Sequence, residues 1–253
     1  PNLRICDTRW YLEDPNQGRE EYDKAHIPGA RYVSLDADLS APEGHGRHPL
    51  PSRHDAAEQF GALGIGDEHT IVAYDSRGGA IAARLWWMLR WIGHERVAVL
   101  DGGTTAWTAA GMPMTDGMPW WLPAQLTVSE SPAMTTIDRQ QLADKIGSID
   151  LVDARSPERY RGDEEPVDPI AGHIPTAINL PYEANLGPDS TMVDAESLAE
   201  RYAGLDFPVV YCGSGVTACH DILAMELAGV PGAVLYPGSW SDWSSSGMET
   251  ASD

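Results

Sequence analysis

Two short runs of apolar and β-branched residues stand out in the hydrophobic pattern of the chain, at 70–75 and 207–212. A glycine- and serine-rich turn follows each run. A helix-like pattern then covers 80–91 and 216–228, and a glycine ends each of these segments. Buried strands that alternate with helices are typical of an α/β fold with a mostly parallel sheet. Ligands in such sheets bind beyond the carboxyl ends of the strands, so we expect the site after one of these runs.

Several short motifs occur twice in the same order, which indicates an internal repeat. An Asp-x-Arg motif and then a His-Ile-Pro motif occur at similar spacing in both halves, and Asp75 and Cys212 hold matching positions. We therefore expect two domains, 1–115 and 133–253, joined by a proline-rich linker at 116–132. Because His26 and His173 recur in both halves, we expect them to have structural roles.

The charge balance limits the partners of the protein. Seventeen Lys and Arg residues face 38 Asp and Glu residues, a formal net charge of −21. Nucleic acids and anionic membranes both attract basic surfaces, so neither is expected as a partner. The most apolar stretch, 81–92, is interrupted by Arg84 and Arg90 and is too short to span a membrane. We expect a soluble monomer.

Three cysteines, an odd number in a chain of 253 residues, favour a reducing, cytoplasmic setting over a disulfide framework. Cys6 is expected inside a strand and Cys219 within a helix, where a buried structural thiol is the simplest interpretation. Cys212 differs because it ends a strand just before a helix begins. We therefore expect Cys212 to be the reactive thiol.

The turn after Cys212 has the composition of an anion-binding loop. Glycines at 213 and 215 allow successive backbone N–H groups to point inward, and with the helix N-terminus these groups favour a thiolate over a thiol. A cysteine phosphatase would need an arginine in this turn, and none occurs between Gly213 and Ala218. The loop suits a persulfide anion instead, without a metal or an organic cofactor. The predicted binding residues in the loop are Gly213, Gly215, Val216 and Thr217.

These motifs together resemble the tandem-domain rhodaneses. The resemblance extends over nearly the whole chain and also includes Arg159-Tyr160-Arg161-Gly162 and the Gly-Ser-Trp motif at 238–240. It implies two rhodanese-like domains, each with a mostly parallel sheet flanked by helices. It also implies that the second domain carries sulfur on Cys212 and that the first, with Asp75 in place of cysteine, is non-catalytic.

The family resemblance further implies a small anionic sulfur donor, either 3-mercaptopyruvate or thiosulfate. Thiosulfate-type loops commonly hold basic residues after the cysteine, whereas Ser214 is similar to the serine of the mercaptopyruvate type. That serine belongs to a proton relay, whose histidine and aspartate match His48 and Asp36 here. We therefore favour 3-mercaptopyruvate, with thiosulfate as the alternative.

The resemblance assigns the donor carboxylate to Arg159 and implies a second arginine shortly before the second His-Ile-Pro motif. No arginine occurs at 164–170, and Arg155 and Arg161 remain as candidates for that contact. The expected acceptors are cyanide, a small thiol or a thioredoxin-type dithiol. A non-catalytic sulfur-carrier or interaction module is the alternative from a different class.

Overall fold

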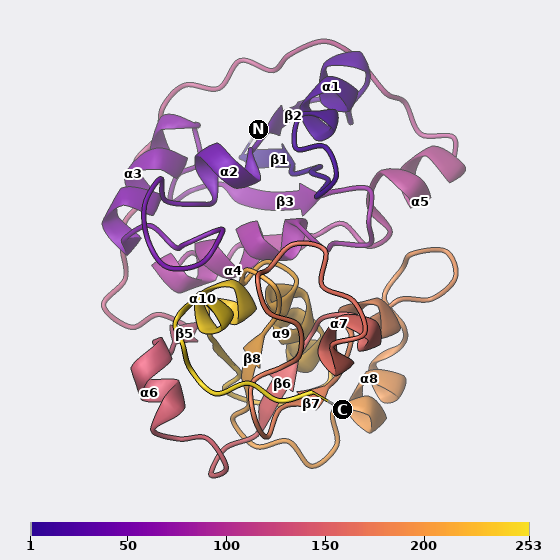
Figure 1. Cartoon of the computed structure of the whole chain (residues 1–253). Coiled ribbons are helices and arrows are strands. Elements are labelled where there is room, and N and C mark those ends of the chain that lie inside the picture. Colours follow the sequence, from indigo (N-terminus) through magenta and orange to yellow (C-terminus); the bar gives the residue numbers. More distant parts are fainter. Residues whose placement is uncertain (1, 253) are drawn as a thin grey trace. The chain divides into compact units, whose positions relative to one another are not determined.

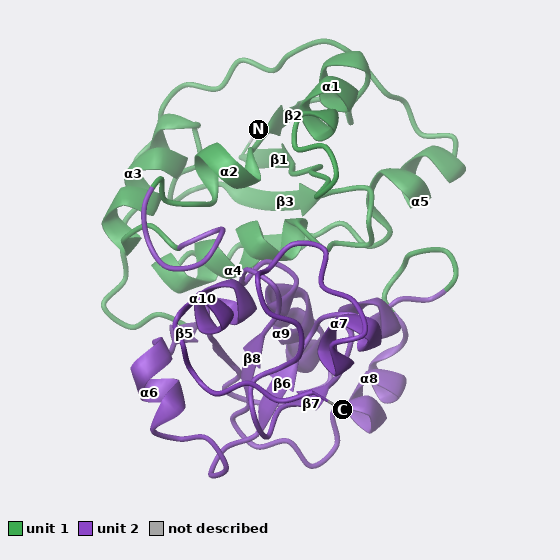
Figure 2. Cartoon of the chain, in the orientation of Figure 1, with its two compact units in different colours: residues 1–42, 50–133, 188–192 green, residues 43–49, 134–187, 193–253 purple. Residues whose placement is uncertain are grey.

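The computed structural model describes residues 2–252, and the chain divides into two compact units (Figures 1 and 2). Unit 1 comprises residues 1–42, 50–133 and 188–192, and unit 2 comprises 43–49, 134–187 and 193–253. Two short segments therefore belong to a different unit from their neighbours in the chain. Hydrogen bonds hold both in place: the backbone N–H of Arg47 donates to Ser241 Oγ (3.1 Å), and that of Met192 donates to Asp101 Oδ1 (2.7 Å).

Unit 1 contains a four-stranded parallel sheet in the order β2-β1-β3-β4. Helix α4 packs against β3 and β4. It is the longest helix at 11 residues, and within residues 2–252 no helix has the length and apolar character needed to cross a bilayer. The elements are β1 (Leu3–Asp7), α1 (Gln17–Lys24), β2 (Ala30–Tyr32), α2 (Leu35–Asp38), α3 (Arg53–Ala62), β3 (Thr70–Tyr74), α4 (Ala82–Ile92), β4 (Val97–Val99) and α5 (Gly103–Ala109).

Unit 2 contains a five-stranded parallel sheet in the order β5-β9-β8-β6-β7. Helix α9 packs against β8 and β9, as α4 does against β3 and β4 in unit 1. The predicted α/β class with two helix-flanked parallel sheets is confirmed. The elements are β5 (Thr135–Thr136), α6 (Arg139–Ala143), β6 (Leu151–Asp153), α7 (Pro157–Arg161), β7 (Ile178–Asn179), the 3₁₀ helix η1 (Tyr182–Asn185), α8 (Ala195–Arg201), β8 (Val209–Tyr211), α9 (Ala218–Leu227), β9 (Val234–Leu235) and α10 (Ser239–Ser245).

One face of the unit 2 sheet is anchored by two tryptophans. Trp240 and Trp243 of α10 are fully buried against Leu151, Val209 and Tyr211. Successive strand residues point to opposite faces of a sheet. Val210, between Val209 and Tyr211, therefore points to the face of the sheet on which α9 packs. Burial of two indole rings is a large apolar contribution, and it fixes α10 beside the end of β8.

The repeated Asp-x-Arg motif forms the same buried ion pair in both units. Arg155 Nη2 donates to Asp153 Oδ2 at 2.7 Å, and Arg9 Nη2 donates to Asp7 Oδ2 at 2.7 Å. Each arginine also donates to a backbone carbonyl just before the His-Ile-Pro segment of its unit. The motif therefore fastens the end of a central strand to the loop that leads into that segment.

The two repeated histidines have the structural role that the repeat predicts. His26 stacks on Tyr22 with ring centroids 4.0 Å apart, and His173 stacks on Tyr160 at 3.9 Å. In each case the ring Nδ1 also lies within hydrogen-bond distance of the tyrosine carbonyl oxygen. Both rings are thus fully engaged in packing.

A buried carboxyl group in α9 makes the stability of unit 2 depend on pH. Asp221 is fully buried, and this burial raises its pKa to about 7 although Asn185 and Tyr202 donate to Oδ1. The folded state therefore binds a proton that the unfolded state has released between about pH 4 and pH 7, so stability falls as pH rises through that window.

We expect Asp221→Asn to remove this pH dependence. Each pKa unit corresponds to about 1.4 kcal/mol, so the variant should be more stable than the parent by roughly 2–4 kcal/mol at pH 8 and about equal to it at pH 4.5. Urea unfolding at the two pH values measures the difference. Asp206→Asn, at an exposed position, is the control. An equal effect of Asp221→Asn at both pH values would contradict the assignment.

Candidate active site

Cys212 lies directly after β8, where a parallel sheet presents its carboxyl ends. The side chain is buried, with 2 % of its surface exposed, and the Gly215 N–H donates to Sγ at 3.2 Å. The backbone of Cys212 is held by α10, because its N–H donates to Ser239 Oγ (3.1 Å) and its carbonyl accepts from the Trp240 N–H (2.9 Å). The sulfur is therefore fixed at the start of a strand-to-helix turn.

Gly215 is required by the shape of this turn. Its φ is +78°, a conformation that residues with a side chain rarely adopt, and a Cβ there would lie 2.6 Å from the Pro237 carbonyl oxygen. Val216 is buried beside it, and Thr217 is the N-cap of α9. The predicted loop residues thus lead from the thiol into the first turn of the helix.

The matching turn of unit 1 is an anion cradle that the chain itself fills. Asp75 Oδ1 accepts the N–H groups of Arg77 (2.7 Å) and Gly79 (2.9 Å), and Oδ2 accepts those of Ile81 (2.7 Å) and Ala82 (2.9 Å). Four backbone donors therefore converge on one buried carboxylate. This arrangement demonstrates that the repeated strand-to-helix turn orients its N–H groups toward negative charge.

Loss of this carboxylate is expected to destabilise unit 1 strongly. Asp75→Ala leaves four backbone N–H groups without their acceptor, three of them buried, which costs roughly 3 kcal/mol or more. Denaturant unfolding, followed by a unit 1 probe, measures the change. Asp101→Ala removes one exposed acceptor and should cost under about 1 kcal/mol. Equal losses for the two variants would show that the cradle contributes no special stability.

His48 and Ser214 meet within unit 2. The distance from Ser214 Oγ to His48 Nδ1 is 2.8 Å, and both residues are buried, with 7 % exposed. The segment 43–49 brings His48 there, because the Arg47 N–H donates to Ser241 Oγ and Gly46 leaves no room for a side chain against the Gly238 carbonyl. A buried hydroxyl beside an imidazole can pass a proton to it.

Asp36 lies in α2, within unit 1. Its side chain is exposed, and Oδ2 accepts a hydrogen bond from Trp10 Nε1 at 2.9 Å. A role for Asp36 in orienting His48 remains a prediction.

Two arginines approach the cysteine loop at Gly213. A Cβ at this position would lie 3.2 Å from Arg159 Nη1 and 2.8 Å from Arg47 Nη2. Arg159 is the arginine that the resemblance implies. Arg47 was not among the predicted site residues, although its position directly before His48 is a signal in the sequence.

The other two candidate arginines lie elsewhere. Arg155 is enclosed by Asp153 and Glu165, and its side chain is 1 % exposed. Arg161 is partly exposed and pairs with Asp163 at 2.8 Å. The structure gives no support to the expectation that one of them supplies the second cation, because Arg155 is held in a buried ion pair and Arg161 pairs with a carboxylate at the surface.

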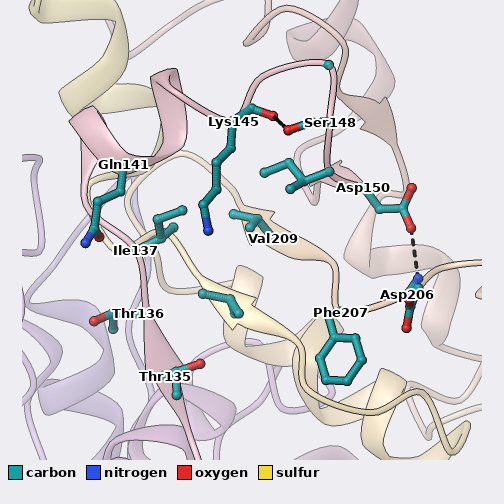
Figure 3. A pocket seen from close by; sticks show the side chains of 13 residues that line it. Thr135, Thr136, Ile137, Gln141, Lys145, Ser148, Asp150, Asp206, Phe207 and Val209 are labelled. Atoms are coloured by element: carbon teal, nitrogen blue, oxygen red, sulfur yellow. Dashed lines mark hydrogen bonds between the residues drawn. The ribbon is translucent and has the colours of Figure 1, made fainter.

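A hollow in unit 2 lies at the opposite end of β8 from Cys212. Its volume is about 760 Å³, and it is lined by Val209, Lys145 and Phe207 among others (Figure 3). Asp206 and Asp150 at its edge are joined by a 2.8 Å hydrogen bond from the Asp206 N–H. Its lining residues include neither cysteine nor histidine, so the chemistry is better assigned to the turn at Cys212.

Comparison with known proteins gives consistent matches along the chain. The family model of the rhodanese-like domain matches residues 1–110 and again 138–246. A probable 3-mercaptopyruvate sulfurtransferase of Pseudomonas aeruginosa is 43 % identical over 255 residues, 96 % of this chain and 89 % of that protein. A putative thiosulfate sulfurtransferase of Mycobacterium tuberculosis is 40 % identical over 254 residues, covering 96 % and 88 %. The solved structure of 3-mercaptopyruvate sulfurtransferase from Leishmania major superposes with a TM-score of 0.84 at 32 % identity, covering 96 % of this chain and 70 % of that one.

Proposed function

Since the chain belongs to the rhodanese family and is a sulfurtransferase, we propose that it moves a sulfane sulfur from 3-mercaptopyruvate to a thiophilic acceptor through a persulfide on Cys212. The family resemblance drawn from the repeated motifs is confirmed by the two domain matches. The observation that supports 3-mercaptopyruvate as the donor is the buried contact of 2.8 Å between Ser214 Oγ in the Cys212 loop and His48 Nδ1 in the segment 43–49.

Sulfur transfer begins with attack by the Cys212 thiolate on the sulfur of the donor. A Cys212–sulfur bond forms, the carbon–sulfur bond of 3-mercaptopyruvate breaks, and its electron pair leaves on the enolate of pyruvate. The Gly215 N–H, 3.2 Å from Sγ, supports stabilisation of negative charge on the cysteine and then on the persulfide.

The proton of the donor thiol must be moved during this step. We assign its removal to the Ser214 hydroxyl, which hands its own proton to His48 Nδ1. The proton held by His48 can return through Ser214 to the methylene carbon of the enolate, so that pyruvate leaves and no net proton is released. Asp36 is proposed to orient His48.

Thiosulfate remains the second candidate donor. The relative from Mycobacterium tuberculosis carries that name at 40 % identity. The Gly215 N–H and the two guanidinium groups at Gly213 would suit a sulfonate as well as a carboxylate. Thiosulfate carries no thiol proton, so its reaction would need no proton transfer by the Ser214–His48 pair.

The persulfide is proposed to pass its outer sulfur to cyanide, a small thiol or a thioredoxin-type dithiol. The three cysteines are free and buried, which suits the cytoplasm as the compartment of this chemistry. The enzyme is proposed to act as a monomer, without a metal or organic cofactor.

A direct comparison of donors tests the proposal. With cyanide as acceptor, kcat/KM for 3-mercaptopyruvate should exceed that for thiosulfate by roughly tenfold or more, because the Ser214–His48 pair assists the transfer of a proton that only 3-mercaptopyruvate carries. Thiocyanate formation measures both rates. A clear preference for thiosulfate would make this protein a thiosulfate sulfurtransferase.

A further inference from the structure

Ser241, in the first turn of α10, links the two chain segments that carry the Ser214–His48 pair. Its backbone N–H donates to the Gly213 carbonyl oxygen (3.0 Å), and its Oγ accepts the Arg47 N–H (3.1 Å). Gly213 and Arg47 are the residues directly before Ser214 and His48 in the chain. We propose that Ser241 is a positioning residue, which holds His48 Nδ1 at hydrogen-bond distance from Ser214 Oγ. This inference rests on the proposed function, in which that pair moves the thiol proton of 3-mercaptopyruvate.

The hydroxyl group of Ser241 is oriented by the start of its own helix. Oγ donates its proton to the Gly238 carbonyl oxygen at 3.1 Å, which leaves a lone pair of the same oxygen for the Arg47 N–H. The side chain is buried, with 7 % of its surface exposed, so water competes little for either bond. One hydroxyl group thus fastens the segment 43–49 to the beginning of α10.

The segment 43–49 depends on such an anchor, because it forms neither a helix nor a strand. It passes very close to α10 at Gly46, where a Cβ would lie 2.6 Å from the Gly238 carbonyl oxygen and 3.0 Å from Ser241 Oγ. Gly46 has a φ of +83°, which residues with a side chain rarely adopt. Close approach and the hydrogen bond to Ser241 together define the course of the segment.

The hydrogen bond at Arg47 acts on the backbone one residue before His48. The Arg47 side chain also donates to Asp168 Oδ1, but through a long side chain that allows the backbone to shift. Proton transfer needs roughly 2.6–3.2 Å between the heavy atoms, and a displacement of about 1 Å can slow a reaction about 10²-fold. The 2.8 Å contact between His48 Nδ1 and Ser214 Oγ therefore requires the backbone anchor that Ser241 supplies.

A double-mutant cycle tests whether Ser241 acts through His48. At saturating 3-mercaptopyruvate, Ser241→Ala should slow persulfide formation in a single turnover by about tenfold. In the His48→Ala background the same substitution should change the rate less than about twofold, because the group that it positions is already absent. The variant keeps the backbone N–H that binds Gly213, so the rate with thiosulfate, which needs no proton transfer, should change less than about threefold.

Ser244→Ala is the matched control. Ser244 is also buried in α10, and among residues 2–252 its Oγ has no hydrogen-bond partner. This variant should leave the rate with either donor within about twofold of the parent protein. A thermal melt of each variant checks the fold.

Amide hydrogen exchange supplies a second readout that does not depend on turnover. The Arg47 amide should exchange about tenfold faster in Ser241→Ala and at the parent rate in Ser244→Ala. Equal rate losses for Ser241→Ala in the two backgrounds, or unchanged exchange at Arg47, would overturn the positioning role. Failure of the parent protein to use 3-mercaptopyruvate would instead refute the proposed function, and amide exchange would still decide whether Ser241 anchors the segment that carries His48.

Discussion

Replacing Cys212 by serine should reduce sulfur transfer from either donor by roughly 10³-fold or more. A serine hydroxyl cannot accept and release a sulfane sulfur, although it occupies nearly the same volume in the buried turn. The Gly215 N–H and the Ser239 contact to the backbone of residue 212 can remain, so the variant should fold. Thiocyanate formation from 3-mercaptopyruvate and cyanide measures the loss, and a thermal melt checks the fold.

Cys6→Ala is the matched control for this prediction. Cys6 lies inside β1 of unit 1, and burial together with the nearby Asp7 carboxylate raises the pKa of its thiol far above the usual range. That thiol stays protonated and unreactive, so its removal should leave kcat/KM within about twofold. Full activity in Cys212→Ser would contradict the account, as would an equal loss in Cys6→Ala.

Ser214→Ala and His48→Ala should separate the two donors. Positioned proton transfer contributes about 10²- to 10⁴-fold, so kcat for 3-mercaptopyruvate should fall by a factor in that range in both variants. Persulfide formation from thiosulfate involves no proton transfer and should change less than about threefold. Single-turnover measurements with each donor detect the difference even where steady-state thiosulfate turnover is slow.

His45→Ala controls for disturbance of the segment 43–49. His45 lies in the same segment, but its side chain is 80 % exposed and its charged partner is Asp242, 3.7 Å away. This variant should leave both donors within about twofold of the parent protein. If Ser214→Ala slowed thiosulfate as much as 3-mercaptopyruvate, the pair would have a structural role instead of a relay role.

The sequence alone predicted the features that depend on local pattern. The strand-to-helix turns after Asp75 and Cys212 follow from short apolar runs and glycines, and the repeated Asp-x-Arg and His-Ile-Pro motifs mark the same elements in both units. Each of these signals extends over a few consecutive residues. Such local patterns can be recognised in a sequence without knowledge of tertiary contacts.

Arg47 could not be predicted in this way. Its place at Gly213 depends on the segment 43–49, which belongs to unit 2 although its neighbours in the chain belong to unit 1. It also depends on Asp168, which lies 121 residues further along the chain. No periodicity or short motif encodes a contact of that separation. A guanidinium group at Gly213 besides that of Arg159 therefore comes from a segment more than 100 residues away from Arg159 in the chain.

The mass of the Cys212 peptide after reaction with 3-mercaptopyruvate tests the central claim most directly. The account predicts that this peptide gains the mass of one sulfur atom and that pyruvate is released in equal amount. Addition of cyanide should then remove the extra sulfur and yield one equivalent of thiocyanate. A peptide that stays unmodified while thiocyanate still forms, or sulfur found on Cys6 or Cys219 instead, would contradict sulfur transfer through Cys212.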